Sequence, residues 1–215
     1  MTEKWGVIVV DVQGDFTEWK NGSLAVPGTG QRYVESVENT TRHLKDKGLG
    51  IFGTQDWHPA DHISFAANHK GKRPFDVITV DDRSQVLWPV HCLQGTENAR
   101  VLVDNNLFLA IVKKGENAAF DSYSGFRDDG GSPTEMDTVL RRNGIGKLLI
   151  YGLATDYCVR ATVLDALQSR YRITVVKDLC RGITPETTAE ALDRMKQQGA
   201  RIVDTLQGIT DEIGS

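Results

Sequence analysis

Apolar runs of strand length recur along the chain, without the alternation of a strand that has one exposed face. They cover residues 7–10, 50–53, 107–112, 148–151, 173–176 and 202–203. Such runs predict strands that are buried on both faces. Three stretches between them carry apolar residues at helical spacing: Tyr33, Val34, Val37 and Leu44, then Val159, Val163, Ala166 and Leu167, then Ala191, Leu192 and Met195. This order predicts an α/β fold with a mostly parallel central sheet and helices on both faces, a three-layer sandwich.

Capping residues mark two helix starts. Ser132 and Pro133 are followed by Glu135, which is the pattern of a capping box with proline at the first helical position. Thr184 and Pro185 form a similar start. We therefore expect helices to begin near these two prolines.

The connection from residue 57 to about residue 106 breaks the alternation of strands and helices. It has little periodicity and is far longer than the few residues usual between elements, and long ordered loops tend to be functional. The sequence contains no internal repeat, low-complexity tract or linker composition. We expect residues 1–215 to form a single domain that carries this long loop.

Composition and charge narrow the classes of function. With 40% hydrophobic and 25% charged residues the chain resembles a soluble globular protein, and its net charge of -4 offers no basic field for nucleic acid. The apolar stretch at residues 7–10 is too short for a signal sequence or a membrane span, so we expect a cytoplasmic protein without membrane association. Gly28 and Gly30 lack the third glycine of a dinucleotide fingerprint, so no nucleotide cofactor is indicated. A small-molecule substrate fits best, and the oligomeric state stays open.

Four polar residues of reactive type lie at the ends of predicted strands. Asp11 closes the first strand, Asp56 follows the second, Lys114 closes the third and Cys158 follows the fourth. In a parallel α/β sheet, ligands bind beyond the carboxyl ends of the strands, where these groups would meet. Each residue alone reads more simply as a solvated turn residue. Their coincidence at one edge favours an active site.

The three cysteines, Cys92, Cys158 and Cys180, are odd in number and widely spaced, which argues against a disulfide framework. Cys158 stands where a strand ends and a helix begins, so the helix dipole and a nearby ammonium would favour the thiolate. Lys114 is the candidate ammonium, and the adjacent Lys113 should point to the opposite face. A small buried side chain is the alternative for Cys158, and the one we prefer for the other two.

Three segments together resemble the nicotinamidases and pyrazinamidases of the isochorismatase-like cysteine hydrolases. They are the segment from Asp11 to Phe16, the segment from Lys114 to Phe126, and the turn from Gly152 to Val159. The departure is Gly14, where asparagine is usual. The resemblance implies the catalytic set Asp11, Lys114 and Cys158, the metal ligands Asp56, His58 and His91, oxyanion donors at Ala154 and Cys158 with a cis peptide at Leu153–Ala154, and ring-binding walls at Phe16, Trp88 and Tyr123.

The spacing of residues supports the metal site only in part. Asp56 and His58 are two apart in an extended segment, so their side chains point to one side. Only the resemblance selects His91 over His62, which we expect beside the site or at its rim. The set suits one divalent ion, zinc foremost, with iron or manganese as alternatives. His43 and His69 are expected to be solvated.

The resemblance implies a metal-dependent amidase that hydrolyses nicotinamide, and also pyrazinamide, through a thioester and without an organic cofactor, as in NAD salvage. Isochorismatases share the fold but lack the cysteine and the metal residues. Another amide, such as a carbamoyl compound, is the alternative substrate. A catalytically dead relative that only binds a metabolite or partner is the alternative from another class.

Overall fold

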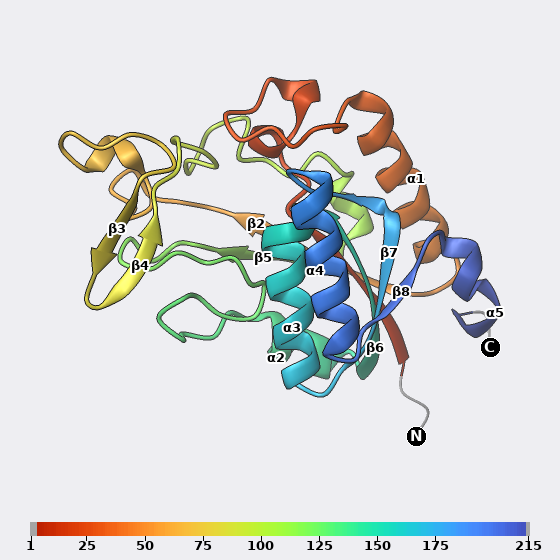
Figure 1. Cartoon of the computed structure of the whole chain (residues 1–215). Helices are drawn as coiled ribbons and strands as arrows, with labels where there is room; N and C mark the ends of the chain where they lie inside the picture. The colour runs from red at the N-terminus through yellow and green to blue at the C-terminus, as the bar shows by residue number, and fades with distance from the viewer. Residues whose placement is uncertain (1–3, 214–215) are drawn as a thin grey trace.

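The computed structural model describes residues 4–213 and contains one six-stranded sheet, a separate hairpin and five α-helices (Figure 1). The strands are β1 (Lys4–Val10), β2 (Gly50–Asp56), β3 (Val77–Val80), β4 (Arg83–Val86), β5 (Ala110–Lys114), β6 (Ile145–Leu153), β7 (Arg172–Arg181) and β8 (Arg201–Val203). The helices are α1 (Gln31–Asp46), α2 (Met136–Arg142), α3 (Arg160–Gln168), α4 (Pro185–Gln197) and α5 (Thr210–Ile213). No helix among the described residues combines the length and apolar character needed to span a membrane.

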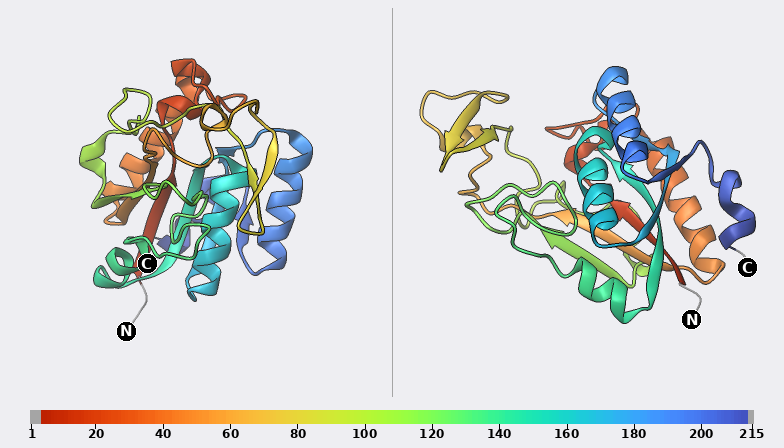
Figure 2. Two further views of the ribbon diagram at one scale, coloured as in Figure 1. Left: turned by 90° about the vertical axis from the view of Figure 1, so that its left-hand side faces the viewer. Right: turned by 60° about the horizontal axis from the view of Figure 1, so that its bottom comes forward.

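All neighbouring strands of the central sheet run parallel, in the order β5-β2-β1-β6-β7-β8. Each of the six apolar runs overlaps one of these strands, which confirms the predicted sheet. α1 lies on one face, and α3 and α4 lie on the other (Figure 2). Because the strand order reverses between β1 and β6, the carboxyl ends of these strands border the crevice where such folds bind ligands.

The apolar character of the central strands explains their place in the fold. Val7, Ile8 and Val10 of β1 and Leu148 of β6 have no exposed surface, since helices cover both faces of the sheet. Burial of such side chains contributes roughly 25 cal/mol for each Å² removed from water. The core therefore fixes the strand ends on which the polar residues stand.

One of the two predicted helix starts is correct. Thr184 caps α4 by accepting a hydrogen bond from the Thr187 backbone, with proline at the start of the helix. α2 instead begins at Met136, whose backbone N–H donates to the Thr134 hydroxyl, and its first turn has no capping box built on Ser132. Arg127 and Pro133 form an isolated bridge, so extended backbone pairing holds the segment where helix was expected.

The long loop contains an element that its composition did not suggest. β3 and β4 pair as an antiparallel hairpin, and Asp81 and Asp82 make the turn with positive φ angles of 48° and 60°. Figure 1 shows the hairpin well away from the helices, beyond the ends of β2 and β5. The loop therefore has local structure of its own at the edge of the sheet that carries the polar residues.

Candidate active site

Asp11 follows β1 directly and is completely buried. Its backbone is in the left-handed region with φ of 47°, which aspartate tolerates better than most residues. Thr54 of β2 holds it twice, because the threonine hydroxyl accepts from the Asp11 N–H at 3.1 Å and donates to the carboxylate at 2.6 Å. Burial raises the pKa of Asp11, and Lys114 opposes this in part. The carboxylate is thus a stronger base than a solvated one.

Lys114, the last residue of β5, is a buried cation surrounded by acceptors. Its Nζ lies 3.0 Å from an Asp11 oxygen, donates to Asp56 and to the Ser122 carbonyl at 2.7 Å, and lies 3.6 Å from the Cys158 sulfur. Burial alone would lower the pKa of Lys114, but the two aspartates raise it well above its ordinary value. Lys113 points away, with its ammonium over the Trp57 ring, so the two lysines face opposite sides as the strand geometry predicted.

Cys158 lies in a single π-helical turn, Thr155–Val159, between β6 and α3. Its sulfur lies within 4.8 Å of carboxylate oxygens of both Asp11 and Asp56. The expectation of a thiol with a lowered pKa is wrong for this structure. Burial raises the pKa of Cys158 well above its ordinary value, the ammonium of Lys114 lowers it only in part, and the two carboxylates raise it further. The resting thiol is therefore protonated, beside a base that can take its proton.

Asp56, His58 and His91 bring one ligand atom each within 4.8 Å of the others, and all three residues are buried. The Nδ1 atoms of His58 and His91 are held by the carbonyls of Gly115 and Pro89, at 2.9 and 2.8 Å. His58 Nε2 is buried without a hydrogen-bond partner and lies 3.5 Å from an Asp56 oxygen. Nitrogens oriented through their second ring atom, together with a carboxylate, are the donor set that a divalent metal ion prefers.

Gly115 makes room for this arrangement. Its φ is 69°, and a Cβ atom here would lie 2.3 Å from the His58 ring. Only a glycine therefore lets the carbonyl of residue 115 reach His58 Nδ1 at the observed ring position.

His62 lies beside this cluster and is not placed as a ligand. Its ring stacks 4.2 Å from the His58 ring, and its two nitrogens are engaged by the Ser64 hydroxyl and the Phe120 carbonyl. It is completely buried, so it belongs behind the metal cluster and not at the rim. His43 is exposed as expected, whereas His69 is half-buried and contacts the Ile63 carbonyl.

One cavity of about 510 Å³ joins Cys158, Asp56 and His91 to the expected aromatic walls. Its lining includes Phe16, Asp56, Trp88, His91, Tyr123, Ala154 and Cys158. Trp88 Nε1 donates to the Tyr123 hydroxyl at 3.1 Å, which fixes the two rings relative to each other. Apolar side chains with large exposed areas, Phe75 at 65% and Ile183 at 42%, also line the cavity. A flat ring suits such walls.

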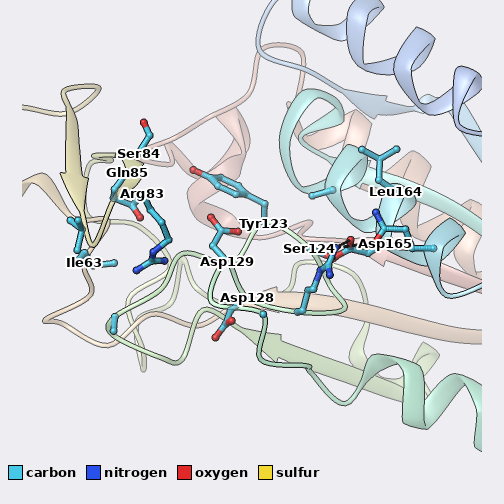
Figure 3. Close-up of a pocket in the computed structure, with 16 residues that line it drawn as sticks. Ile63, Arg83, Ser84, Gln85, Tyr123, Ser124, Asp128, Asp129, Leu164 and Asp165 are labelled. Atoms are coloured by element: carbon cyan, nitrogen blue, oxygen red, sulfur yellow. Dashed lines mark hydrogen bonds and ion pairs between the residues drawn. The ribbon is translucent and has the colours of Figure 1, made fainter.

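A second cavity, of about 560 Å³, shares Tyr123 with the first but contains none of the reactive residues (Figure 3). Its charged lining residues are Arg83, Arg127, Asp128, Asp129 and Asp165. Arg127 pairs with Asp165 at 2.6 Å, and burial raises the pKa of Asp129 to about 6. The chemistry of the site therefore belongs to the first cavity.

The backbone around the expected oxyanion donors differs in one respect from the expectation. No cis peptide bond occurs among residues 4–213, so the Leu153–Ala154 bond is trans. The Ala154 carbonyl accepts from the N–H groups of Tyr157 and Val159 and so starts the turn that carries the cysteine. Ala154 and Cys158 both line the cavity.

The sequence profile of the isochorismatase domain matches residues 6–207 of the chain. The chain belongs to the isochorismatase family. It is 40% identical to a nicotinamidase of Escherichia coli (strain K12) over 201 residues, which cover 91% of this chain and 92% of the relative. The profile match covers all three segments.

Two proteins of similar structure have been solved with a ligand bound. The pyrazinamidase of Pyrococcus horikoshii in complex with zinc is 38% identical, with a TM-score of 0.78 over 93% of this chain and 98% of that one. The yeast nicotinamidase bound to the inhibitor nicotinaldehyde is 33% identical, with a TM-score of 0.86 over 94% of this chain and 100% of that one.

The departure of this family member at Gly14 has a structural explanation. A Cβ atom on Gly14 would lie 2.7 Å from the Asn98 Cα, so the long loop occupies the space of a side chain there. Asp15 remains buried and accepts a 2.6 Å hydrogen bond from the Cys92 N–H, next to His91. The segment therefore keeps its contact with the metal-bearing loop.

Several residues that hold the site were not predicted in this isochorismatase-family chain. Gln13 accepts from the Asp56 N–H and donates to the Asp56 carbonyl. Thr54 holds Asp11, and Asp121 accepts from the Gln85 and Trp88 side chains. Gln13 lies inside a matched segment, and Thr54 is two residues before Asp56 on the same strand. A contact of both residues with the site could therefore have been predicted from their positions in the sequence. Asp121 lies inside the matched segment from Lys114 to Phe126, so its position offered a signal too.

Proposed function

We propose that this protein is a metal-dependent cysteine amidase that hydrolyses nicotinamide to nicotinate and ammonia, with pyrazinamide as a further substrate. The observation that carries the proposal is the contact of Lys114 with both Asp11 and Cys158. Cys158 lines an aromatic-walled cavity, and a cluster of one aspartate and two histidines lies beside these residues. The similarity to proteins named nicotinamidase supports the substrate.

The first half-reaction forms a thioester. Asp11 accepts the proton of the Cys158 thiol while the sulfur adds to the carboxamide carbon, and the electron pair of the C=O π bond moves to oxygen. Backbone N–H groups of Ala154 and Cys158 are the proposed donors to this oxyanion. The C–N bond then breaks, the nitrogen takes the proton from Asp11, and ammonia leaves.

The second half-reaction restores the enzyme. Water adds to the thioester carbon as Asp11 accepts one of its protons, and the C–S bond breaks with its electron pair on sulfur. The thiolate recovers the proton from Asp11, and the acid product ionises to nicotinate. Lys114, a fixed buried cation, stabilises the negative charge that arises on sulfur and on Asp11 in both halves.

Asp56, His58 and His91 are the residues that would hold a divalent metal ion, zinc first, with iron and manganese as alternatives. When bound, the ion supplies a Lewis acid that orients the substrate through its pyridine nitrogen. Phe16, Trp88 and Tyr123 are proposed to enclose the ring. No organic cofactor is needed for this chemistry.

The three cysteines are free and buried, which supports a reducing compartment such as the cytoplasm as the place of action. We also propose that residues 1–215 act as one domain, since the site draws on strands along most of the described chain.

The deciding experiment is an ammonia-release assay on purified, metal-loaded protein with nicotinamide, before and after a chelator. We expect release that the chelator abolishes and that added zinc restores. A non-aromatic amide serves as the control. Hydrolysis of that amide by a protein that left nicotinamide intact would contradict the proposed substrate.

A further inference from the structure

The hydroxyl of Ser122 has no partner within the protein. Four buried side-chain nitrogen or oxygen atoms lack a hydrogen bond in the described part of the chain. The Asp11 oxygen among them pairs with the Lys114 ammonium, His58 Nε2 belongs to the metal cluster, and Thr155 lines a different cavity. Of these four residues, Ser122 is the one that lines the catalytic cavity, and it has no role in the mechanism above. Because burying an unpaired hydroxyl costs free energy, a hydrogen bond to a ligand is its natural use.

The backbone of Ser122 is held firmly beside the reacting sulfur. Its N–H donates to Asp121 at 2.9 Å, and its carbonyl accepts from Lys114 Nζ at 2.7 Å. The same Nζ lies 3.6 Å from the Cys158 sulfur, so one ammonium group contacts both residues. Only 2% of Ser122 is exposed, and its side chain is the shortest that can carry a hydroxyl. The group is therefore rigid and close to the reaction centre.

The proposed mechanism decides which end of a carboxamide this hydroxyl would meet. The backbone N–H groups of Ala154 and Cys158 hold the carbonyl oxygen, and Asp11 protonates the nitrogen. Lys114 Nζ contacts Asp11, the Ser122 carbonyl and the Cys158 sulfur, so Ser122 lies beside the group that serves the nitrogen. The carboxamide nitrogen is therefore the end left to meet the Ser122 hydroxyl.

We propose that the Ser122 hydroxyl accepts a hydrogen bond from the N–H of the substrate carboxamide, and so selects amides over esters of the same acid. This rests on the proposed function, whose mechanism places the carbonyl oxygen at Ala154 and Cys158. An ester has the same ring and carbonyl but no N–H to donate. Ser122 is thus a specificity-determining contact, separate from the groups that make and break bonds.

The test compares Ser122→Ala with the wild-type metal-loaded enzyme on nicotinamide and on methyl nicotinate. For both substrates, kcat/KM reports on the steps up to and including formation of the thioester. We expect the variant to lose about tenfold on the amide and less than about twofold on the ester, because only the amide loses a hydrogen bond. An amide loss that exceeds the ester loss by less than about threefold would overturn the proposal.

Two controls separate this role from a structural one. Ser122→Ala should keep its metal content and keep or raise the Tm, since it removes an unpaired buried hydroxyl; loss of either would contradict the proposal. Ser124→Ala, two residues on, removes a buried hydroxyl that accepts from the Phe126 N–H, and should leave the amide-to-ester ratio unchanged. A wild-type protein that released no ammonia from nicotinamide would contradict the proposed function. An unmoved ratio in an active enzyme would contradict only the role of Ser122.

Discussion

Replacing Lys114 by methionine should destabilise the protein severely. The ammonium is completely buried and is the cation that contacts both Asp11 and Asp56. Methionine has a similar length but leaves the carboxylates without their partner. Removing one member of a buried ion pair costs about 3–5 kcal/mol. For a chain of this size each kcal/mol lowers the Tm by about 2–4 °C, so we expect a loss of about 6–20 °C.

The loss of stability in Lys114→Met should depend on pH in a direction that can be checked. In Lys114→Met the Asp11 carboxylate loses the cation that lowers its pKa, so burial raises the folded-state pKa further above the unfolded value. A group whose pKa is higher in the folded state than in the unfolded state stabilises the protein fully at a pH below its unfolded-state pKa. This stabilisation is lost as the pH rises through its folded-state pKa. The deficit should therefore be large at pH about 7 and shrink towards pH about 4.

Equilibrium urea unfolding measures the effect, with Lys113→Met as the matched control. Lys113 is the preceding residue of the same strand and is exposed, with its ammonium over the Trp57 ring, so its loss should cost below about 1 kcal/mol. The double variant Asp11→Asn with Lys114→Met should recover part of the loss, since it removes the stranded charge. Equal stability of the two lysine variants at neutral pH would refute the assignment of Lys114 as the neutralising group.

Three further predictions concern the reaction. Cys158→Ala should lower turnover by at least about 10⁴-fold with metal content unchanged, and loss of activity through alkylation of a different cysteine would disprove the assignment. His91→Ala should lose bound metal while His62→Ala keeps most of it, as elemental analysis of both proteins will show. Thr54→Val removes a hydrogen bond that lowers the pKa of Asp11, so the acid limb of the kcat/KM profile should move to higher pH. An acid limb at the same pH in the variant and the wild type would show that Asp11 is not the group whose titration sets that limb.

The central sheet and the meeting of reactive groups were predictable because they follow from runs of buried residues. Strands buried on both faces leave few other arrangements, and the residue after each strand then falls at the same edge. The hairpin was missed because β3 is only four residues long and its turn consists of Asp81 and Asp82 and lacks the glycine usual there. The available signal was the run of β-branched residues from Val77 to Val80, which favours a strand.

The direction of the Cys158 pKa shift was not predictable from sequence. Helix position and a nearby lysine both favour the thiolate, and both features are present. Burial of the thiol, together with the approach of Asp11 and Asp56 from two other strands, raises the pKa of Cys158 more than Lys114 lowers it. Neither can be read from the residues around the cysteine, because both depend on how distant segments pack.

Part of the cavity wall and the reacting atoms come from different kinds of structure. Phe75, Val77, Val86 and Trp88 belong to the long loop and its hairpin. Asp11, Lys114 and Cys158 stand at the ends of buried strands or directly beyond them. Loops tolerate substitutions, insertions and deletions far better than buried strands do. Relatives could therefore evolve towards new ring systems through changes in residues 75–88, which lie between the proposed metal ligands His58 and His91, while inheriting the same bond-breaking chemistry. Directed evolution of substrate range should begin with a library confined to residues 75–88.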